Sequence, residues 1–304
     1  MSRLPAFVFA GATSVVTGAA SGMGEQLARQ LADRGSDLVL LDRTGDRLTE
    51  IAAEITAAHP ERAVETHTVD LGDADALREV AVRIRAAHPQ VDLLVNNAGV
   101  ALGGLFEQMT LEELDWVMAI NFRAPVALTH HLLPALLVTP GAHLVNTSSV
   151  FGLIAPPGQT AYCSSKFALR GWSESMRSEL APHGVGVTTV HPGGIATAIA
   201  RTSRAAGGLD EQDAERGRAF ADRFLTYPAD RAATVILEAV RRRRPRLLIA
   251  ASARIPDVLQ RAFPAHYTSV FGLVQSRLVK SGFSSRAVKG STPHEGSELS
   301  RHRT

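Results

Sequence analysis

The sequence contains a single cysteine, Cys163, so no disulfide can form within the chain. Its 11 histidines are scattered, and no group of cysteines and histidines has the spacing of metal ligands. We therefore expect no bound metal, and we expect a cytoplasmic protein because a reducing compartment suits such a chain. A chain of 304 residues that is 45% hydrophobic can bury a large core without disulfide or metal crosslinks.

Long apolar runs are also missing. The apolar stretch within the first 16 residues is too short to cross a bilayer, and it leads directly into a glycine-rich turn. We interpret this stretch as the approach to a first strand, with a signal peptide as the weaker alternative.

The sequence has no large excess of charge of one sign, since its formal net charge is +2, but the acidic and basic residues are unevenly distributed along it. Residues 1–240 carry 27 acidic and 19 basic side chains, whereas residues 241–304 carry 3 acidic and 13 basic ones. The basic segment could contact anionic lipid, an acidic partner or the acidic body of the protein. The simpler interpretation is a solvated tail, and we expect no nucleic-acid partner.

Short apolar segments alternate with amphipathic segments along the chain. The predicted strands are 14–17, 37–41, 63–69, 91–95, 143–146, 185–190 and 246–249. The predicted helices are 23–34, 46–58, 73–87, 111–137, 161–180 and 229–241, with kinks at Pro125 and Pro134. This alternation predicts an α/β fold with one doubly wound parallel sheet of about seven strands, covered by helices on both faces. No linker or internal repeat interrupts it, so we expect one domain over residues 1–283.

Three segments depart from the alternation. Residues 196–226 are polar and weakly periodic and follow the sixth strand, where such sheets place ligands, so they are a candidate lid. Residues 250–283 carry apolar side chains at helical spacing, which predicts one or two helices packed on the body or on a partner subunit. Residues 284–304 are rich in Ser, Gly, Arg and His and are expected to be a disordered basic tail.

A glycine-rich turn follows the first predicted strand, with Gly18, Gly22 and Gly24 at the spacing G-x3-G-x-G. Such a turn before a helix can bring backbone N–H groups against a pyrophosphate. Asp42 ends the second predicted strand, where a carboxylate can bind the adenosine ribose and repel a 2′-phosphate. This favours NAD, but Arg43 could meet a phosphate or lie on the adenine, so NADP stays open. Alternatively, Asp42 only caps the next helix.

Tyr162 and Lys166 are four residues apart on a predicted helix and therefore share one face. An ammonium group close to a phenol lowers the phenol pKa, so Tyr162 could exchange a proton with a carbonyl or alcohol oxygen. Ser149 directly follows the fifth predicted strand, and its hydroxyl could hold that oxygen. On its own, a Tyr-x3-Lys pair is common on helix surfaces.

Six segments together resemble those of the classical short-chain dehydrogenase/reductase family, over about residues 10–200. They are the T-G-x3-G-x-G turn at 17–24, Asn96-Asn97-Ala98-Gly99, Asn121, the segment 146–149 that ends at Ser149, Tyr162-Cys163-Ser164-Ser165-Lys166, and Pro192-Gly193 with Thr197.

The resemblance implies specific roles. Tyr162 is the acid/base, Lys166 binds the nicotinamide ribose and lowers the pKa of Tyr162, and Ser149 positions the substrate oxygen. Asn121 holds a water that links Lys166 to solvent. The residues implied in cofactor binding, including those inferred above, are Gly18, Ser21, Gly22, Met23, Gly24, Asp42, Arg43, Asp70, Leu71, Asn97, Ala98, Gly99, Tyr162, Lys166, Pro192, Gly193, Ile195 and Thr197.

The leading hypothesis is an NAD(P)-dependent oxidoreductase that interconverts a secondary alcohol and a ketone, or an aldehyde and an alcohol. An apolar substrate is suggested by the side chains of Phe220, Phe224, Leu225 and Tyr227. The alternatives are a dinucleotide-binding sensor or scaffold without turnover, and an epimerase or dehydratase that retains NAD. Membrane contact through the basic C-terminus could coexist with catalysis. We expect a homodimer or homotetramer.

Overall fold

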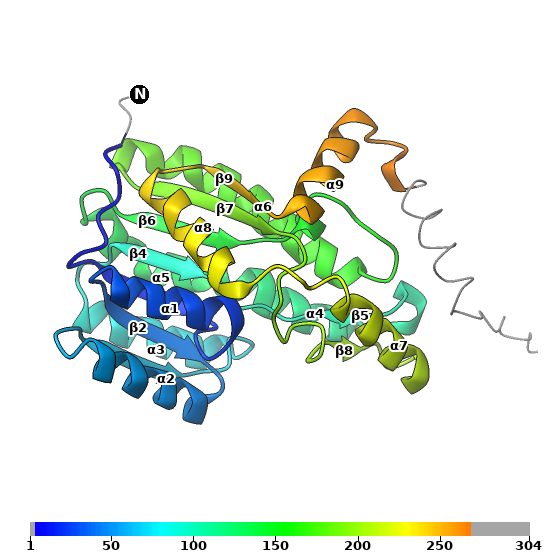
Figure 1. Ribbon diagram of the computed structural model, residues 1–304, viewed down its shortest axis with the longest axis horizontal. Coiled ribbons are helices and arrows are strands. Elements are labelled where there is room, and N and C mark those ends of the chain that lie inside the picture. Colours follow the sequence, from blue (N-terminus) through cyan, green and yellow to red (C-terminus); the bar gives the residue numbers. More distant parts are fainter. Residues whose placement is uncertain (1–3, 269–304) are drawn as a thin grey trace, which may run out of the picture.

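The computed structural model describes residues 4–268, and its centre is a parallel sheet of seven strands (Figure 1). The strands are β1 (Thr13–Thr17), β2 (Asp37–Asp42), β3 (Val64–Thr68), β4 (Leu93–Asn96), β6 (His143–Thr147), β7 (Gly186–Pro192) and β9 (Arg246–Ile249). Their order in the sheet is β3-β2-β1-β4-β6-β7-β9, and every pairing is parallel. All seven predicted strands are present, and the predicted doubly wound α/β fold is confirmed.

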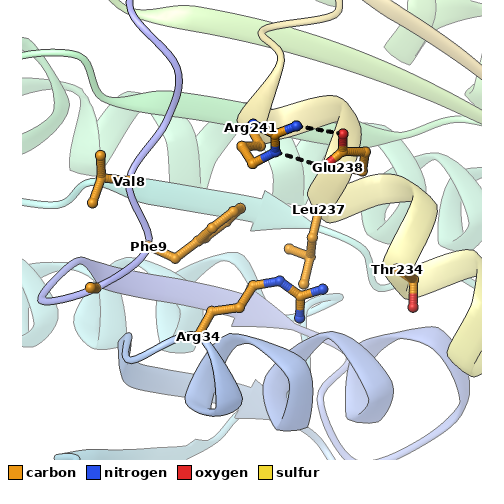
Figure 2. Close-up of a pocket in the computed structure, with 8 residues that line it drawn as sticks. Val8, Phe9, Arg34, Thr234, Leu237, Glu238 and Arg241 are labelled. Carbon is orange, nitrogen blue, oxygen red and sulfur yellow. Dashed lines mark hydrogen bonds and ion pairs between the residues drawn. The ribbon is translucent and has the colours of Figure 1, made fainter.

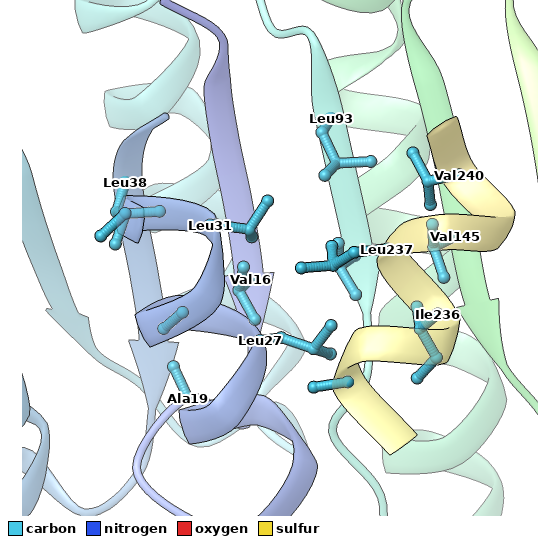
Figure 3. Close-up of a cluster of buried hydrophobic side chains, with 14 of the residues drawn as sticks. Val16, Ala19, Leu27, Leu31, Leu38, Leu93, Val145, Ile236, Leu237 and Val240 are labelled. Atoms are coloured by element: carbon cyan, nitrogen blue, oxygen red, sulfur yellow. The ribbon is translucent and has the colours of Figure 1, made fainter. Parts of the chain in front are cut away.

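Helices cover both faces of this sheet. Helices α1 (Gly22–Asp33), α2 (Gly45–Ala58) and α8 (Ala229–Arg241) share one hydrophobic cluster with the sheet, and α3 (Ala74–Ala87), α5 (Ala124–Leu137) and α6 (Thr160–Leu180) share the other. Successive strand residues alternate between the clusters, as Val15 and Val16 of β1 do. Figure 3 shows the first cluster, in which Leu27 of α1 and Leu237 of α8 close over the sheet. Because both faces are buried, central strands such as β4 and β2 are apolar almost throughout, whereas the edge strand β3 is polar and partly exposed.

The predicted long helix 111–137 is interrupted. It consists of α4 (Leu111–Met118), a π-helical turn over Ala119–Arg123, and α5. Pro125 has no N–H, so the carbonyl of Asn121 loses its helical partner four residues on, and the helix bulges directly before the proline. The predicted kink at Pro125 is therefore a π turn that contains Asn121, while Pro134 lies inside α5.

The candidate lid is more ordered than the sequence predicts. It contains β8 (Arg204–Ala205) and α7 (Glu211–Asp222), and β8 pairs in parallel with β5 (Leu102–Gly103) in a separate two-stranded sheet. An isolated bridge between Ile195 and Tyr227 joins the two ends of the segment. The lid is thus fixed at its base and near its middle. Two-residue strands are too short to leave a periodic pattern, which explains why β5 and β8 were not predicted.

The chain after β9 turns sharply at Ala250, which has φ 70°, into α9 (Ala251–Ala262). Helix α9 accounts for the first part of the predicted helical extension; the predictions for residues 269–283 and for the tail 284–304 lie outside the described residues. The remaining short helices are the 3-10 turns η1 (Phe106–Gln108), η3 (Val150–Gly152) and η4 (Ala181–His183). None of the helices within residues 4–268 is long and apolar enough to cross a membrane.

A pocket of about 520 Å³ lies between the N-terminal segment, the end of α1 and α8 (Figure 2). Phe9 and Arg34 border it, and Arg241 forms an ion pair with Glu238 at its rim. These residues precede β1, β2 and β9, so the pocket lies at the amino ends of the strands. Ligands of doubly wound sheets bind at the carboxyl ends, and the predicted site residues lie there instead.

Candidate active site

The predicted site residues gather at the carboxyl ends of the parallel strands. The chain runs from β1 through β2 to β3 on one side of β1, and then continues at β4 on the other side. The crevice at such a reversal of strand order is where open α/β sheets bind ligands.

The glycine-rich turn between β1 and α1 depends on the absence of side chains. Gly18 and Gly22 have φ values of +69° and +54°, in the left-handed region. A Cβ on Gly18 would lie 2.9 Å from the Cα of Ala98, and a Cβ on Gly24 would overlap the carbonyl oxygen of Gly18. Gly18 and Gly24 therefore let the turn, α1 and the segment after β4 pack backbone against backbone.

Helix α1 presents its N-terminus to this crevice. Ser21 is the N-cap residue and is exposed, and Met23, in the first turn, packs partly buried against the hydrophobic cluster below. The N–H groups of a first helical turn have no partner within the helix and carry the positive end of its dipole. This end of α1 can therefore hold a pyrophosphate.

Thr17 joins the turn to the segment Asn97-Ala98-Gly99 after β4. Its hydroxyl accepts hydrogen bonds from the backbone N–H of Asn97 (3.0 Å) and of Ala98 (3.1 Å), and its carbonyl accepts one from the Asn97 amide (3.1 Å). The Asn97 Oδ1 is buried without a hydrogen-bond partner in the part of the chain that the structure describes. A buried acceptor of this kind is normally satisfied, so it suits a hydroxyl group of a bound ligand.

Asp42 lies at the end of β2 and points to the glycine-rich turn. Its carboxylate accepts one hydrogen bond from the N–H of Ala20 (3.0 Å) and another from that of Thr44 (2.9 Å). The N-cap of α2 is Thr44, and Asp42 bonds no N–H of that helix, so the alternative that Asp42 only caps the next helix is wrong. Each carboxylate oxygen can accept further hydrogen bonds, so the ribose interpretation stays compatible with this geometry. Arg43 is exposed beside it.

Asp70 and Leu71 follow β3. Asp70 is exposed, and its carboxylate accepts a hydrogen bond from the N–H of Gly72 (2.8 Å). Leu71 packs partly buried against the hydrophobic cluster of α3 and α5. The side chain of Leu71 is therefore turned to the core, whereas Asp70 is accessible to a ligand.

The segment after β7 closes the other side of the crevice. Pro192 ends β7, and the N–H of Gly193 donates to the carbonyl of Ile249 (3.1 Å). Beyond Ile195, the methyl group of Thr197 reaches the turn, since it lies 3.0 Å from where a Cβ on Gly22 would be. The structure thus brings the start of the lid to the glycine-rich turn.

Ser149 and Tyr162 meet above the end of β6. Ser149 caps the turn η3, and its Oγ accepts a hydrogen bond from the N–H of Phe151 (3.1 Å). The Ser149 hydroxyl also acts on the phenol of Tyr162, from the first turns of α6, and lowers the pKa of that phenol. The ring of Phe151 stands edge-on to that of Tyr162, with 6.1 Å between centroids.

Lys166 lies one helical turn after Tyr162 and is buried. Its Nζ is 5.7 Å from the centre of the Tyr162 ring and donates a hydrogen bond to the Thr147 carbonyl (2.9 Å). Both this Nζ and the Oδ1 of Asn121 lie 3.2 Å from where a Cβ on Gly99 would be. The absence of a side chain at Gly99 therefore lets Asn121 of the π turn and Lys166 of α6 approach the same place.

Asn121 is fully buried in the π turn, and both its amide oxygen and its amide nitrogen are hydrogen-bonded to protein groups. Its Oδ1 accepts from the Val100 N–H (2.8 Å), and its Nδ2 donates to the Val100 carbonyl (2.9 Å) and to Ser165 Oγ (3.0 Å). These bonds fix the loop after β4 against α6. A water between Asn121 and Lys166 stays a prediction.

Burial sets the pKa values of the central pair. It raises the pKa of Tyr162 to about 12, opposed by the hydrogen bond from Ser149, and it lowers the pKa of Lys166 to about 8. The sequence led us to expect a lowered pKa for Tyr162. Among the protein's own groups this expectation is wrong, because the pKa is raised. The physical reason is that the phenolate would lose hydration in this site, and burial disfavours the charged form of Lys166 as well.

Some residues that build the site were not predicted. Thr17 belonged to the recognised turn motif, but its role as a link to β4 was not inferred. Ser148 lay in the recognised segment 146–149 without an assigned role; its hydroxyl donates to the Lys166 carbonyl (2.9 Å) and so holds α6. Ser165, the partner of Asn121, was present in the recognised helix motif and could have been considered there.

No group of three or more His, Cys, Asp or Glu side chains that could hold a metal ion occurs within residues 4–268. Cys163, beside Tyr162, is buried, and burial raises its thiol pKa to about 12. A thiol with such a pKa is unreactive at neutral pH, which agrees with a structural role.

Residues 12–207 match the sequence model of the short chain dehydrogenase family. A relative from Mycobacterium tuberculosis, "Putative oxidoreductase SadH", is 34% identical over 262 residues, which cover 85% of this chain and 93% of that protein. "Dehydrogenase/reductase SDR family member 7B" from Bos taurus is 35% identical over 223 residues, which cover 70% of this chain and 68% of that protein.

Solved structures with the same fold contain dinucleotides. A short chain dehydrogenase/reductase from Burkholderia phymatum in complex with NAD superposes with a TM-score of 0.76 at 29% identity, over 84% of this chain and 95% of that one. A metagenomic short-chain oxidoreductase in complex with NADP gives a TM-score of 0.63 at 30% identity, over 79% and 97% of the two chains. The fold, the site geometry and these matches agree, and the chain belongs to the short-chain dehydrogenase/reductase family.

Proposed function

We propose that this chain is an NAD(P)-dependent oxidoreductase that interconverts a secondary alcohol and a ketone, or an aldehyde and an alcohol. The observation that carries the proposal is the buried Lys166 beside the Tyr162 ring, with Ser149 acting on the Tyr162 phenol, at the edge of the glycine-rich crevice. Relatives with NAD and with NADP support the class of cofactor.

The residues of the crevice fit a dinucleotide. The turn at Gly18, Gly22 and Gly24 leaves no room for side chains, and the N-terminus of α1 faces the same space. The unpartnered Oδ1 of Asn97 supplies an acceptor for a ribose hydroxyl. Asp42 at the end of β2 favours an unphosphorylated adenosine ribose, so we propose NAD as the preferred cofactor.

When bound, the nicotinamide ring supplies or accepts a hydride. Tyr162 carries its proton at neutral pH, because its pKa of about 12 is far above that range, so it is ready to donate this proton to a carbonyl oxygen. Ser149 can donate a second hydrogen bond to the same oxygen and stabilise the charge that develops there. In the direction of reduction, the proton lost by Tyr162 leaves a phenolate, which the ammonium of Lys166 stabilises.

The proposal extends to the class of substrate and to the oligomeric state. The lid and the segment after η3 border the substrate side, and Phe224 is exposed there. We propose an apolar carbonyl or alcohol, because an exposed aromatic beside the crevice can contact such a compound. We also propose a cytoplasmic homodimer or homotetramer built from one catalytic domain.

The test is a panel of ketones and secondary alcohols, assayed by nicotinamide absorbance with NAD(H) and with NADP(H). We expect turnover of at least one apolar member and a higher kcat/KM with NAD(H). A protein that binds the dinucleotide but turns over no member, and whose Ser149→Ala variant behaves identically, would be a sensor or scaffold and would refute the proposal.

A further inference from the structure

His191 occupies a position that the proposed chemistry does not use. It is the second-last residue of β7, directly before Pro192, and its side chain is fully buried. Its Nδ1 lies 3.1 Å from the carbonyl oxygen of Ser149. This carbonyl also accepts the N–H of Gly152 (3.0 Å), which closes the turn η3.

The hydrogen bond of the His191 imidazole follows directly after the last backbone hydrogen bond between β6 and β7. The ladder between β6 and β7 pairs Thr147 with Val190, and its last bond runs from the N–H of Ser148 to the Val190 carbonyl (2.8 Å). The next residue, Ser149, has left the sheet and receives the imidazole instead of a backbone N–H. The ring therefore ties β7 to the backbone of Ser149 itself.

The chemistry of this contact assigns the protons on the ring. A carbonyl oxygen can only accept, so Nδ1 carries the proton, and in a neutral imidazole Nε2 is then an acceptor. Nε2 is buried without a hydrogen-bond partner in the described part of the chain. Burial lowers the His191 pKa to about 4, and the positive charges of Arg246 and Arg170 contribute. The hydrogen bond to Ser149 and the charge of Asp257 raise this pKa and offset part of the effect. The ring is neutral, and its donation to Ser149 does not change across the neutral range.

Within the described residues, the other backbone bond of Ser149 comes from Gly152, which belongs to the same turn η3. The Ser149 Oγ accepts from Phe151, which also belongs to η3, so neither this bond nor that of Gly152 ties Ser149 to the sheet. We propose that His191 is a positioning residue for Ser149: its Nδ1–H fixes the serine backbone, so that the hydroxyl stays in register with Tyr162 and the substrate oxygen. This inference rests on the proposed function.

Two amide substitutions separate positioning from general support of the fold. The amide nitrogen of His191→Asn can take the place of Nδ1, whereas the longer side chain of His191→Gln places its amide near Nε2. Both variants bury one amide in place of the ring, so a purely structural role predicts similar losses. We expect His191→Gln to lower kcat by about ten- to a hundredfold with an unchanged KM for the dinucleotide, and His191→Asn to recover kcat to within about threefold of wild type.

Crystal structures of both variants provide a readout that needs no turnover. We expect Ser149 Oγ to leave the N–H of Phe151 in His191→Gln and to keep this contact in His191→Asn. Equal kcat values for the two variants, or an unmoved Ser149 in His191→Gln, would overturn the inference. If wild type reduces no ketone, the proposed function fails, and the crystal structures still decide the role of His191. If neither variant folds, nitrogen NMR of wild-type His191 decides it, since a proton on Nε2 contradicts donation to Ser149.

Discussion

Lys166 is buried at a cost in stability, and Lys166→Met should reveal that cost. Burial lowers the Lys166 pKa from 10.5 to about 8, and one pKa unit corresponds to about 1.4 kcal/mol, so burying the charged form costs about 3 kcal/mol. Methionine lacks the hydrogen bond to the Thr147 carbonyl, which contributes about 1 kcal/mol. We therefore expect the free energy of unfolding to rise by about 2 kcal/mol at neutral pH, while turnover is lost.

The dependence on pH identifies the cause. Below pH 8 the lysine is charged in both the folded and the unfolded protein, so the full cost is present. Between about pH 8 and pH 10.5 the unfolded chain still binds the proton that the folded protein has released, and wild-type stability rises with pH. The advantage of Lys166→Met should therefore shrink across this range.

Urea unfolding, followed by the fluorescence of the two tryptophans, measures this difference at about pH 7 and about pH 10. Arg223→Met is the control, because Arg223 is exposed and its loss should change stability by less than about 0.5 kcal/mol. A Lys166→Met protein that is less stable than wild type at neutral pH would refute the reasoning. So would an advantage that is the same at both pH values.

Three further predictions follow from burial and close packing. Burial lowers the pKa of His143 to about 3 and of His191 to about 4, so below pH 6.5 the unfolded chain binds more protons than the folded protein. The free energy of unfolding should therefore fall by up to about 2.7 kcal/mol per pH unit toward pH 4. A free energy of unfolding, measured in urea, that stays constant over this range would contradict the prediction. Asp42→Ala should raise the ratio of kcat/KM with NADP to that with NAD by about tenfold, and an unchanged ratio would remove Asp42 from cofactor choice. Gly24→Ala should destabilise the protein by more than about 2 kcal/mol, whereas Gly217→Ala, in an open helical position, should stabilise it by about 0.5–1 kcal/mol; equal thermal midpoints would show that the turn is not tightly packed.

Most of the sheet was predictable because all its strands except the edge strand β3 are largely buried. A run such as the one that forms β2 is apolar at every interior position, and glycines or charged residues bound it. The glycine-rich turn was equally visible, since only glycine fits where Gly24 crosses Gly18. Burial of a strand and close packing of a turn both restrict the residue types at neighbouring positions, so they can be recognised in a short stretch of sequence.

Contacts between distant segments left no local pattern. The hydroxyl of Thr17 meets Asn97 from 80 residues away, and His191 meets Ser149 from 42 residues away. The π turn at Asn121 depends on Pro125, which the sequence shows, but a proline alone does not tell a kink from a π turn. The pKa of Tyr162 depends on its burial, which the one-turn spacing to Lys166 could not supply.

The most direct measurement compares Tyr162→Phe with wild type in dinucleotide affinity and in turnover of whichever ketone the panel identifies. Removing one hydroxyl should leave the dissociation constant within about twofold and reduce kcat by about a hundredfold or more, since the proton donor is lost and the ring is kept. A phenylalanine variant that reduces the ketone at the wild-type rate would contradict the assignment of Tyr162 as the acid.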